Sequence, residues 1–279
     1  ETAIKSSRRW AYRTKKVEPG KAEIIVADGN FHGRTTTIIS FSTDENSKKD
    51  FGPHTPGFKA VKYGCSQSIE AAINENTAAV LIEPIQGEGG IIVPPKNYLK
   101  EVREICTKNN VLMLLDEIQS GLGRTGKLFA YQHSCGDCNC NIGCEENQIK
   151  ESMPDGLILG KALGGGFMPV SCFLTSKEVM QWMDPGSHGS TFGGNPLAAA
   201  LAKRSLELLD EENLIENSRI MGDYFKESLL GMNSKIIKEI RGMGLWLGVE
   251  IDPELISGKD LSRMCLDHGI LCKETHETT

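Results

Sequence analysis

The sequence predicts an α/β protein in which helices cover a mainly parallel β-sheet and a smaller α+β domain follows. Short apolar runs, at residues 23–27, 78–82 and 111–115, alternate with amphipathic helical stretches. Continuous apolar runs bounded by helices are typical of strands buried on both faces of a parallel sheet. Beyond Asn195 this alternation gives way to long helical stretches, which indicates the second domain.

The expected elements follow the chain in order. Residues 1–15 have the pattern of a helix without a start signal, so we expect the chain to be cut from a longer protein at this end and at the other. Strands are expected at residues 23–27, 78–82, 111–115 and 156–159, with a helix at residues 98–109. Further helices are expected at residues 196–209, 214–230 and 261–268, a strand-like segment with a glycine-rich centre at residues 236–251, and the start of a strand at residues 269–272.

Two domains follow from this order. Residues 1–195 are expected to form the large domain, incomplete at its amino terminus and interrupted by a cysteine-rich insertion at about residues 133–152. Residues 196–279 are expected to form an interdomain helix and the start of the small domain, also incomplete. Because Gly, Asp and Asn accompany its cysteines, we interpret the insertion as a surface loop.

Composition narrows the class of function. With 39% hydrophobic and 24% charged residues the chain is globular, and its net charge of −6 without a basic stripe argues against nucleic acid as a partner. No apolar run approaches the roughly 20 residues that cross a bilayer, so we expect no membrane association. Nine scattered cysteines suit a reducing compartment. We expect a soluble intracellular protein that acts on small molecules, in the mitochondrial matrix or the cytoplasm; the missing amino terminus would decide which.

A carboxylate follows the strand expected at residues 111–115. Asp116 is the residue directly after this run, and a glycine-rich segment, residues 120–126, comes shortly after it. The carboxyl end of a buried parallel strand is where α/β sheets bind ligands. A carboxylate in this position also serves as the N-cap of a following helix, and the residues alone leave both interpretations open.

A single lysine lies between the last expected strand of the sheet and a glycine-rich turn. Lys161 follows residues 157–160 and precedes Ala162-Leu-Gly-Gly-Gly166. Glycines let a bulky group approach the backbone, and a lysine with a depressed pKa can form a Schiff base with an aldehyde cofactor. An ordinary solvated lysine fits the same position.

A loop rich in hydroxyl groups and glycine precedes the first long helix of the second domain. Its sequence is Ser187-His-Gly-Ser-Thr-Phe-Gly-Gly-Asn-Pro196. Hydroxyl and backbone N–H donors in such a loop suit a phosphate, although a plain turn with Pro at the first helical position has the same composition.

These three segments, in this order, resemble the class III aminotransferases of fold type I. Further segments, at residues 29–35, 51–53, 82–90 and 241–245, are similar to those of ornithine aminotransferases, and the resemblance covers nearly the whole chain except the insertion. It implies pyridoxal 5'-phosphate as the cofactor, bound by a large domain with a seven-stranded type of sheet. It also implies a homodimer or higher oligomer with shared active sites.

The resemblance implies a role for each matching residue at the cofactor. Lys161 would hold the cofactor as a Schiff base and then shuttle a proton as general base and acid. Asp116 would pair with the protonated pyridine nitrogen and keep the ring an electron sink. Phe31 would stack on the ring, Gln119 would hydrogen-bond its phenolic oxygen, and Thr191 would bind the phosphate in the neighbouring subunit.

Three charged residues match the substrate pocket of the family. Arg34 would fork onto a substrate carboxylate, a task suited to the planar guanidinium, although an arginine on a solvated loop remains an alternative. Glu88 would act as a gate that pairs with Arg34 for one substrate and releases it for the other. Glu83 would support the cofactor ring or the gate, with a purely structural role as the alternative. Phe192 replaces a tyrosine common in ornithine aminotransferases.

The function implied is transfer of the δ-amino group of L-ornithine to 2-oxoglutarate, which yields L-glutamate 5-semialdehyde and L-glutamate. The alternative within enzymes is an acetylornithine or 4-aminobutyrate aminotransferase. An alternative outside enzymes is a catalytically incompetent fragment or paralogue that acts as a binding partner, because segments that complete the family's pocket lie outside this sequence.

The cysteine-rich insertion is outside the resemblance. Cys135, Cys138, Cys140 and Cys144 offer four thiolates, the number that structural zinc requires. The single residue between Cys138 and Cys140 is awkward for a tetrahedral site. Cys135 and Cys138 have the Cys-x2-Cys spacing, but the second pair that a zinc knuckle site needs is absent. We therefore expect a loop rather than a zinc site, and no resident metal.

Overall fold

The structure is a computed structural model that describes residues 1–134, 151–275 and 278–279. Within these ranges the larger sheet has six strands in the order β2-β1-β3-β4-β5-β6. The strands are β1 (Glu23–Ala27), β2 (Phe58–Val61), β3 (Thr77–Ile82), β4 (Leu112–Asp116), β5 (Gly156–Leu159) and β6 (Cys172–Thr175). All neighbouring pairs are parallel except β5 with β6, so the sheet is mainly parallel, as predicted.

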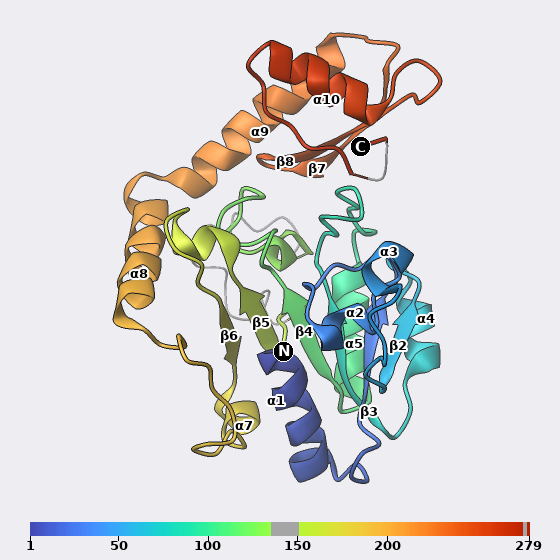
Figure 1. Ribbon diagram of the computed structural model, residues 1–279, viewed down its shortest axis with the longest axis vertical. Helices are drawn as coiled ribbons and strands as arrows, with labels where there is room; N and C mark the ends of the chain where they lie inside the picture. The colour runs from blue at the N-terminus through green and yellow to red at the C-terminus, as the bar shows by residue number, and fades with distance from the viewer. Residues whose placement is uncertain (135–150, 276–277) are drawn as a thin grey trace.

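Helices connect these strands and pack against the two faces of the sheet (Figure 1). They are α1 (Thr2–Trp10) with a π-helical turn (Ala11–Lys15), α2 (Thr36–Ile39), α3 (Glu45–Lys48), α4 (Ser66–Ala72), α5 (Tyr98–Lys108) and α7 (Lys177–Met180), with 3-10 turns at Ala130–Ser134 and Lys161–Gly164. The strand expectations at residues 23–27, 78–82, 111–115 and 156–159 are confirmed to within one residue at each end, whereas β2 and β6 were not predicted.

The core has two apolar layers, one on each face of the sheet. Strand side chains alternate between faces, so Ile24 and Val26 pack in the layer that contains α1, and Ile25 packs in the layer that contains α5. All three are fully buried. Burial of one such side chain stabilises the fold by about 1.5–3 kcal/mol. The two layers therefore determine which face of the sheet packs against which helices.

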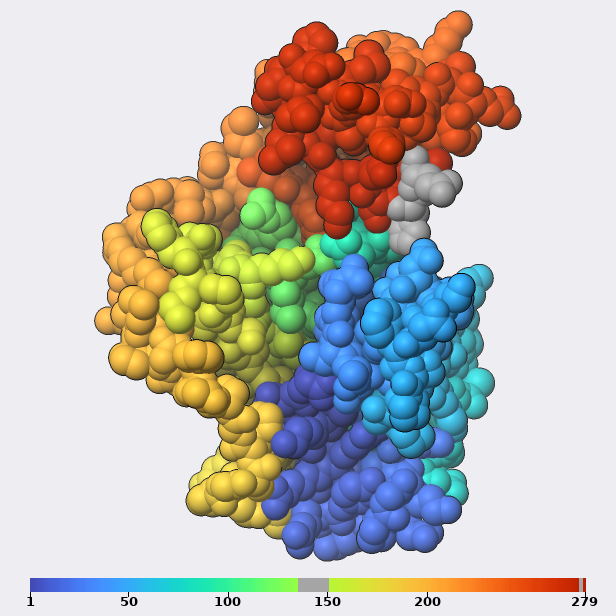
Figure 2. Space-filling view, viewed as in Figure 1, coloured from blue at the N-terminus to red at the C-terminus, as the bar shows by residue number. Residues whose placement is uncertain are grey.

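The carboxyl-terminal part of the chain forms a separate lobe joined to the sheet by two long helices (Figure 1). Its elements are α8 (Pro196–Glu211), α9 (Leu214–Gly231), β7 (Ile237–Met243), β8 (Trp246–Ile251) and α10 (Gly258–Asp267). Strands β7 and β8 pair antiparallel as a hairpin, which is the glycine-centred segment expected from the sequence. Figure 2 shows this lobe lying over the edge of the larger body.

One expected element of this lobe is wrong. Residues 270–275 form no strand. The side chains of Ile270 and Leu271 are 59% and 88% exposed. In the described part of the lobe, no strand lies beside this apolar run to form backbone hydrogen bonds with it, so it does not become a strand.

Two further expectations concern membrane-spanning helices and the domain boundary. Among the described residues, no helix is both long and apolar enough to cross a membrane. The domain boundary at residue 195 stays a prediction.

Helix α9 approaches the β7–β8 turn at a single glycine. A Cβ on Gly222 would collide with the backbone carbonyl of Gly244, whereas one on Gly231, at the end of the same helix, would meet nothing within 4 Å. Close contact between the helix and the turn therefore requires glycine, which has no side chain, at position 222.

We expect Gly222→Ala to lower the free energy of unfolding by about 1–3 kcal/mol, because the helix must move away from the hairpin. Gly231→Ala is the matched control and should be neutral or slightly stabilising, since alanine favours the helix. Urea unfolding of both variants measures the difference. Equal stability of the two variants would contradict this packing.

Candidate active site

The carboxylate at the end of β4 is held by two hydrogen bonds. Asp116 is 6% exposed, and its Oδ2 lies 2.8 Å from Nδ1 of His32. Its Oδ1 accepts a hydrogen bond from the backbone N–H of Ile118 at 3.1 Å. Turns rather than a helix follow Asp116, so the interpretation of this residue as a plain N-cap is wrong.

The partner of Asp116 is a residue that sequence reasoning missed. His32 lies in the segment at residues 29–35, and its side chain is 2% exposed. Burial by itself lowers the pKa of an imidazole, but the hydrogen bond and charge of Asp116, with the charge of Glu83, outweigh burial and raise the pKa of His32. Its Nε2 has no hydrogen-bond partner among the described residues.

A second buried carboxylate lies next to this pair. Glu83, directly after β3, accepts hydrogen bonds from the backbone N–H groups of Phe31 at 3.1 Å and Gly87 at 3.3 Å. Burial raises the pKa of Glu83 to about 7, against the opposing effects of His32 and of the two N–H donors. Glu83 therefore fixes the backbone on both sides of the site, which gives it a clear structural role.

Lys161 begins the turn after β5. Its backbone has φ +45°, and Gly165 and Gly166 beyond it also have positive φ. Partial burial lowers the pKa of its amine, opposed by the charges of Glu88, Asp116 and Glu83. Within the described ranges no group hydrogen-bonds this amine. The side chain is thus an amine without a hydrogen bond to any described residue, and its pKa is set by partial burial and by the negative charges of three carboxylates.

Two adjoining cavities separate Asp116 from Lys161. One, of about 490 Å³, is lined by Asp116 and His32, and the other, of about 510 Å³, is lined by Lys161 and Gly166. Ile118 and Ser171 line both, so the cavities share a wall. Because β4 and β5 are parallel neighbours, both side chains lie at the same edge of the sheet.

Glu88 and Gln119 meet above this edge. The Gln119 Nε2 donates to Oε1 of Glu88 at 3.5 Å, and Lys273 Nζ lies 2.7 Å from Oε2 of Glu88. Partial burial tends to raise the pKa of Glu88, but the hydrogen bond and charge of Lys273 outweigh it and lower that pKa. A Cβ on Gly87 would meet the Gln119 Oε1 at 2.6 Å, so only glycine allows this approach.

The expected pair between Arg34 and Glu88 is absent from this structure. Glu88 binds Lys273 instead, while the Arg34 guanidinium lies 5.5 Å from the centroid of the Phe31 ring. Arg34 is exposed and forms no ion pair with any described residue. Its carboxylate-binding role and the stacking role of Phe31 stay predictions.

The loop before α8 reaches the Asp116 cavity with part of its length. Gly189, Ser190 and Gly193 line that cavity, whereas Thr191 is exposed and does not. The loop ends in an N-cap, because the Asn195 side chain accepts the Ala198 N–H at 2.9 Å. The structure therefore does not bring Thr191 to the site of its own chain.

The metal hypothesis cannot be placed on the structure. Cys135, Cys138, Cys140 and Cys144 lie outside the described residues, so the zinc idea stays a prediction. Within the described ranges, no group of three or more His, Cys, Asp or Glu side chains could hold a metal ion.

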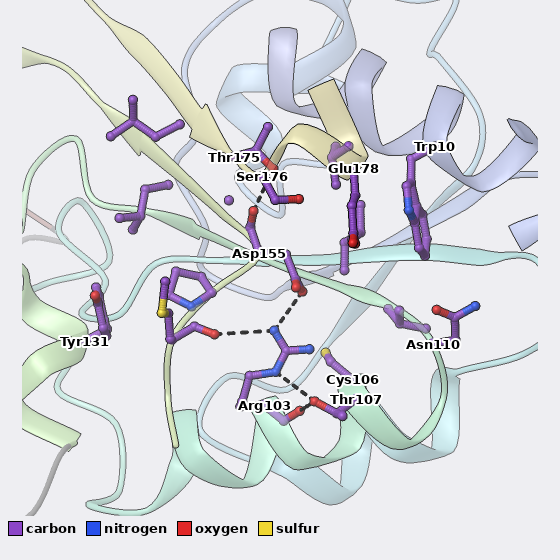
Figure 3. A pocket seen from close by; sticks show the side chains of 18 residues that line it. Trp10, Arg103, Cys106, Thr107, Asn110, Tyr131, Asp155, Thr175, Ser176 and Glu178 are labelled. Atoms are coloured by element: carbon purple, nitrogen blue, oxygen red, sulfur yellow. Dashed lines mark hydrogen bonds and ion pairs between the residues drawn. The ribbon is translucent and has the colours of Figure 1, made fainter. Parts of the chain in front are cut away.

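A larger cavity, of about 790 Å³, lies at the opposite end of β4 and β5 (Figure 3). Arg103 in its wall donates to Asp155 at 2.7 Å and, through Nε, to Thr107 at 3.0 Å. Its guanidinium is thus already engaged. Ligands of parallel sheets bind beyond the carboxyl ends of the strands, which places the functional site at the Asp116 edge rather than here.

This chain belongs to the class III aminotransferases. The profile of the family "Aminotransferase class-III" matches residues 1–279, and the architecture is that of the fold type I transferases.

The similar proteins include ornithine aminotransferases. The enzyme of Brevibacillus brevis is 49% identical over the whole chain, which covers 65% of that relative, and the enzyme of Exiguobacterium sp. is 50% identical, with 64% covered. The crystal structure of ornithine aminotransferase from Toxoplasma gondii has a TM-score of 0.91 at 41% identity over 99% of this chain and 63% of that one. Acetylornithine aminotransferase from Elizabethkingia anophelis has a TM-score of 0.81 at 40% identity, over 99% of this chain and 65% of that one. The chain thus spans somewhat less than two thirds of the length of these proteins.

The raised pKa of Glu83 predicts a pH dependence of stability. The folded state holds a proton on Glu83 up to about pH 7, whereas an unfolded glutamate loses it near the ordinary glutamate pKa of 4.5. The contribution of Glu83 to the free energy of unfolding is therefore full at low pH and is lost as the pH rises through 7. The loss amounts to at most about 3 kcal/mol. Glu83→Gln should remove this part of the slope between about pH 5 and pH 8.

Urea unfolding of the cofactor-free protein across this range measures the slope. Glu117, whose pKa burial also raises to about 7, contributes equally to the wild type and the variant and cancels in the difference. Glu75→Gln, at an exposed position, is the control and should leave the slope unchanged. Parallel curves for wild type and Glu83→Gln would show that Glu83 is ionised in the folded state throughout.

Proposed function

We propose that the full-length protein is a pyridoxal-phosphate-dependent aminotransferase that moves the δ-amino group of L-ornithine to 2-oxoglutarate. The observation that carries the proposal is the arrangement at the ends of two neighbouring parallel strands. Asp116, oriented by His32, ends β4, and Lys161, with a lowered pKa, follows β5. A carboxylate and a reactive amine at one sheet edge suit a cofactor that needs both.

The residues present fit this cofactor. His32 Nε2 is a buried polar atom without a described partner, beside a cavity of about 490 Å³ that has room for a small aromatic phosphate. The positive φ of Gly165 and Gly166 leaves the backbone next to Lys161 free of side chains. A second Toxoplasma gondii ornithine aminotransferase structure is described with partial occupancy of pyridoxal phosphate at its active site.

Five residues would hold the cofactor. Lys161 would bind it covalently, Asp116 would pair with the pyridine nitrogen, Phe31 would stack on the ring, Gln119 would bind the phenolic oxygen, and Thr191 would bind the phosphate in a partner subunit. When bound, pyridoxal phosphate supplies an electron sink for the negative charge left on the substrate carbon after a proton departs.

The protein supplies orientation and proton transfer. The His32 hydrogen bond fixes the carboxylate of Asp116, so this charge needs no reorganisation during the reaction. Lys161 Nζ takes the proton from the substrate carbon and returns it to another atom, a task suited by its lowered pKa.

Substrate choice rests on the residues above the sheet edge. Arg34, which forms no ion pair with a described residue, is available to bind a substrate carboxylate, and Glu88 and Glu83 would support the substrate pocket and the cofactor ring as the family resemblance implies. Ornithine is favoured because relatives at 49–50% identity carry the name ornithine aminotransferase. The likeness to an acetylornithine aminotransferase structure at 40% identity makes N-acetylornithine the second candidate.

Substrate competition tests the assignment. The full-length protein is assayed with ornithine, N-acetylornithine and 4-aminobutyrate at equal concentrations, with 2-oxoglutarate as acceptor. Ornithine should give the highest kcat/KM. A clear preference for either of the other two donors would overturn the ornithine assignment while leaving the aminotransferase class intact.

Lys161→Ala should fold normally, because the residue is exposed and a glycine-rich turn tolerates a smaller side chain. Its kcat should fall at least several hundredfold, since general acid–base assistance alone contributes about 10²- to 10⁴-fold and the covalent anchor is lost as well. Circular dichroism checks the fold, and a coupled assay measures turnover. Retention of more than a tenth of the activity would contradict the role of Lys161.

A homodimer would cover large apolar side chains that are exposed in this chain. Phe167, Phe192 and Leu197 are 85%, 78% and 61% exposed, and they lie in the segments that follow Lys161 and contain the Thr191 loop. Large exposed apolar groups close together are typical of interfaces. A second copy packed here would carry its own Thr191 toward the neighbouring site.

Mixed dimers test whether sites are shared. Lys161→Ala and Thr191→Ala chains are each expected to be impaired alone, but a hybrid dimer has one site with both native residues. After random reassociation half of the dimers are hybrids, so activity should rise to about a quarter of the wild-type value. No gain over the average of the two separate variants would place Thr191 in the site of its own chain.

A further inference from the structure

The hydroxyl of Ser218 joins three segments of the chain. Ser218 lies in α9 and is 7% exposed. Its Oγ donates to the backbone carbonyl of Arg124 at 2.9 Å and accepts a hydrogen bond from the backbone N–H of Leu245 at 3.2 Å. Arg124 lies in the glycine-rich loop at residues 120–126, and Leu245 lies in the turn between β7 and β8. One buried hydroxyl therefore connects helix α9, a loop at the sheet edge and the hairpin.

Glycines bring the same three segments into close contact. A Cβ on Gly244 would lie 2.5 Å from the carbonyl carbon of Thr125, and a Cβ on Gly126 would lie 2.9 Å from Cβ of Arg219 in α9. Carbon atoms that are not bonded to each other stay about 3.5–4.0 Å apart, so this packing requires glycine at both positions. Ser218 thus supplies its hydrogen bonds inside a closely packed junction.

The hairpin also rests on a second loop of the sheet edge, residues 86–92. In β7, Arg241 Nε donates to the carbonyl of Gly90 at 2.8 Å. In β8, the indole of Trp246 lies against Gly87, because a Cβ on that glycine would meet Cζ2 of the ring at 2.9 Å. The hairpin therefore contacts this loop as well as helix α9 and the glycine-rich loop.

Two residues with predicted roles at the site lie at this contact. Glu88 belongs to the loop itself, and Gln119 Nε2 donates to its Oε1 at 3.5 Å. The Oε1 of Gln119 would lie 2.6 Å from a Cβ on Gly87, the same glycine that Trp246 covers. The indole and the amide converge on one point, so a shift of the hairpin would change the space that is open to Gln119.

We propose that Ser218 is a positioning residue, whose hydroxyl holds the β7–β8 hairpin against the loop at residues 86–92 and so sets the positions of Glu88 and Gln119. This role depends on the proposed function, because that function gives Glu88 and Gln119 their tasks at the substrate and the cofactor. Ser218 forms no hydrogen bond with either of them in the described part of the chain. Its effect on both therefore passes through the hairpin.

Hydrogen exchange in the full-length, cofactor-free protein tests the effect on the loop. The loop has backbone hydrogen bonds of its own, including the pair between Gln86 and Ile92 at 3.0 and 2.9 Å, so its amides are protected while it is held. In Ser218→Ala the amides of residues 86–92 should exchange roughly two- to ten-fold faster, the effect of losing one ordinary hydrogen bond. The amides of α4, which packs on α5 and β2, should keep their rates.

Ser228→Ala is the matched control. Ser228 lies further along α9, is exposed, and donates from Oγ to the carbonyl of Tyr224 in the same helix at 2.7 Å. The change removes the same hydroxyl from the same helix and should leave exchange at residues 86–92 unchanged. Equal acceleration in Ser218→Ala and Ser228→Ala, or none in Ser218→Ala, would overturn the proposal.

A double-mutant comparison assigns the effect to the hairpin. Arg241→Lys keeps a positive charge beside Glu250 but removes the Nε donor to Gly90. In this background the step from Ser218 to Ala should speed exchange of the loop less than in the wild type, because the hairpin holds the loop less firmly. An equal change in both backgrounds would show that Ser218 acts by another route, against the proposal.

Steady-state kinetics of the full-length enzyme extends the test to the site. Ser218→Ala should raise the KM for ornithine about two- to ten-fold with a smaller change in kcat, because Glu88 and Gln119 lose their positions. A purely structural role would lower kcat at unchanged KM, since fewer molecules are folded, and that result would contradict positioning. The exchange measurements contain no substrate, so they can succeed while ornithine transamination fails, and the substrate assay can succeed while they fail.

Discussion

Parallel pairing of β3, β4 and β5 is the constraint on which the rest of this site depends. Each strand runs in the same direction, so Asp116 at the end of β4, and Glu83 and Lys161 after β3 and β5, are delivered to one edge of the sheet. The strands themselves are apolar and buried, and only their ends can hold polar groups. The same burial that stabilises the sheet gives Glu83 its raised pKa, so stability and chemistry here have one source.

The sequence allowed the sheet edge to be predicted because its signals are local. An apolar run followed by a carboxylate, and a lysine between a strand and a glycine turn, are visible within ten residues. His32 was missed although its segment was recognised, because its partner lies 84 positions away and no local pattern pairs the two. Lys273 was missed for the same reason, because it lies 185 positions from Glu88. The apolar run at residues 269–272 also suggested a strand, although no neighbouring strand in the described part of the chain is available to pair with it. In this structure Glu88 contacts Lys273, so the substrate-dependent pair between Glu88 and Arg34 stays a prediction.

The carboxyl-terminal lobe is part of the site rather than an appendage to it. It holds the Glu88 loop through Lys273, Thr275 and Arg241, and the glycine contact between α9 and the β7–β8 turn fixes the hairpin that carries Arg241. A change in the position of this lobe would therefore move the loop that carries Glu88 without touching any residue of the sheet.

The central claim is that Lys161 is the amine that binds the cofactor at the edge next to Asp116. Reduction with borohydride after addition of pyridoxal phosphate to the full-length protein fixes the cofactor to the lysine that holds it, and peptide mapping locates the label. We expect a phosphopyridoxyl group on the peptide that spans residues 159–166. A label on Lys127 or Lys177 instead would contradict it.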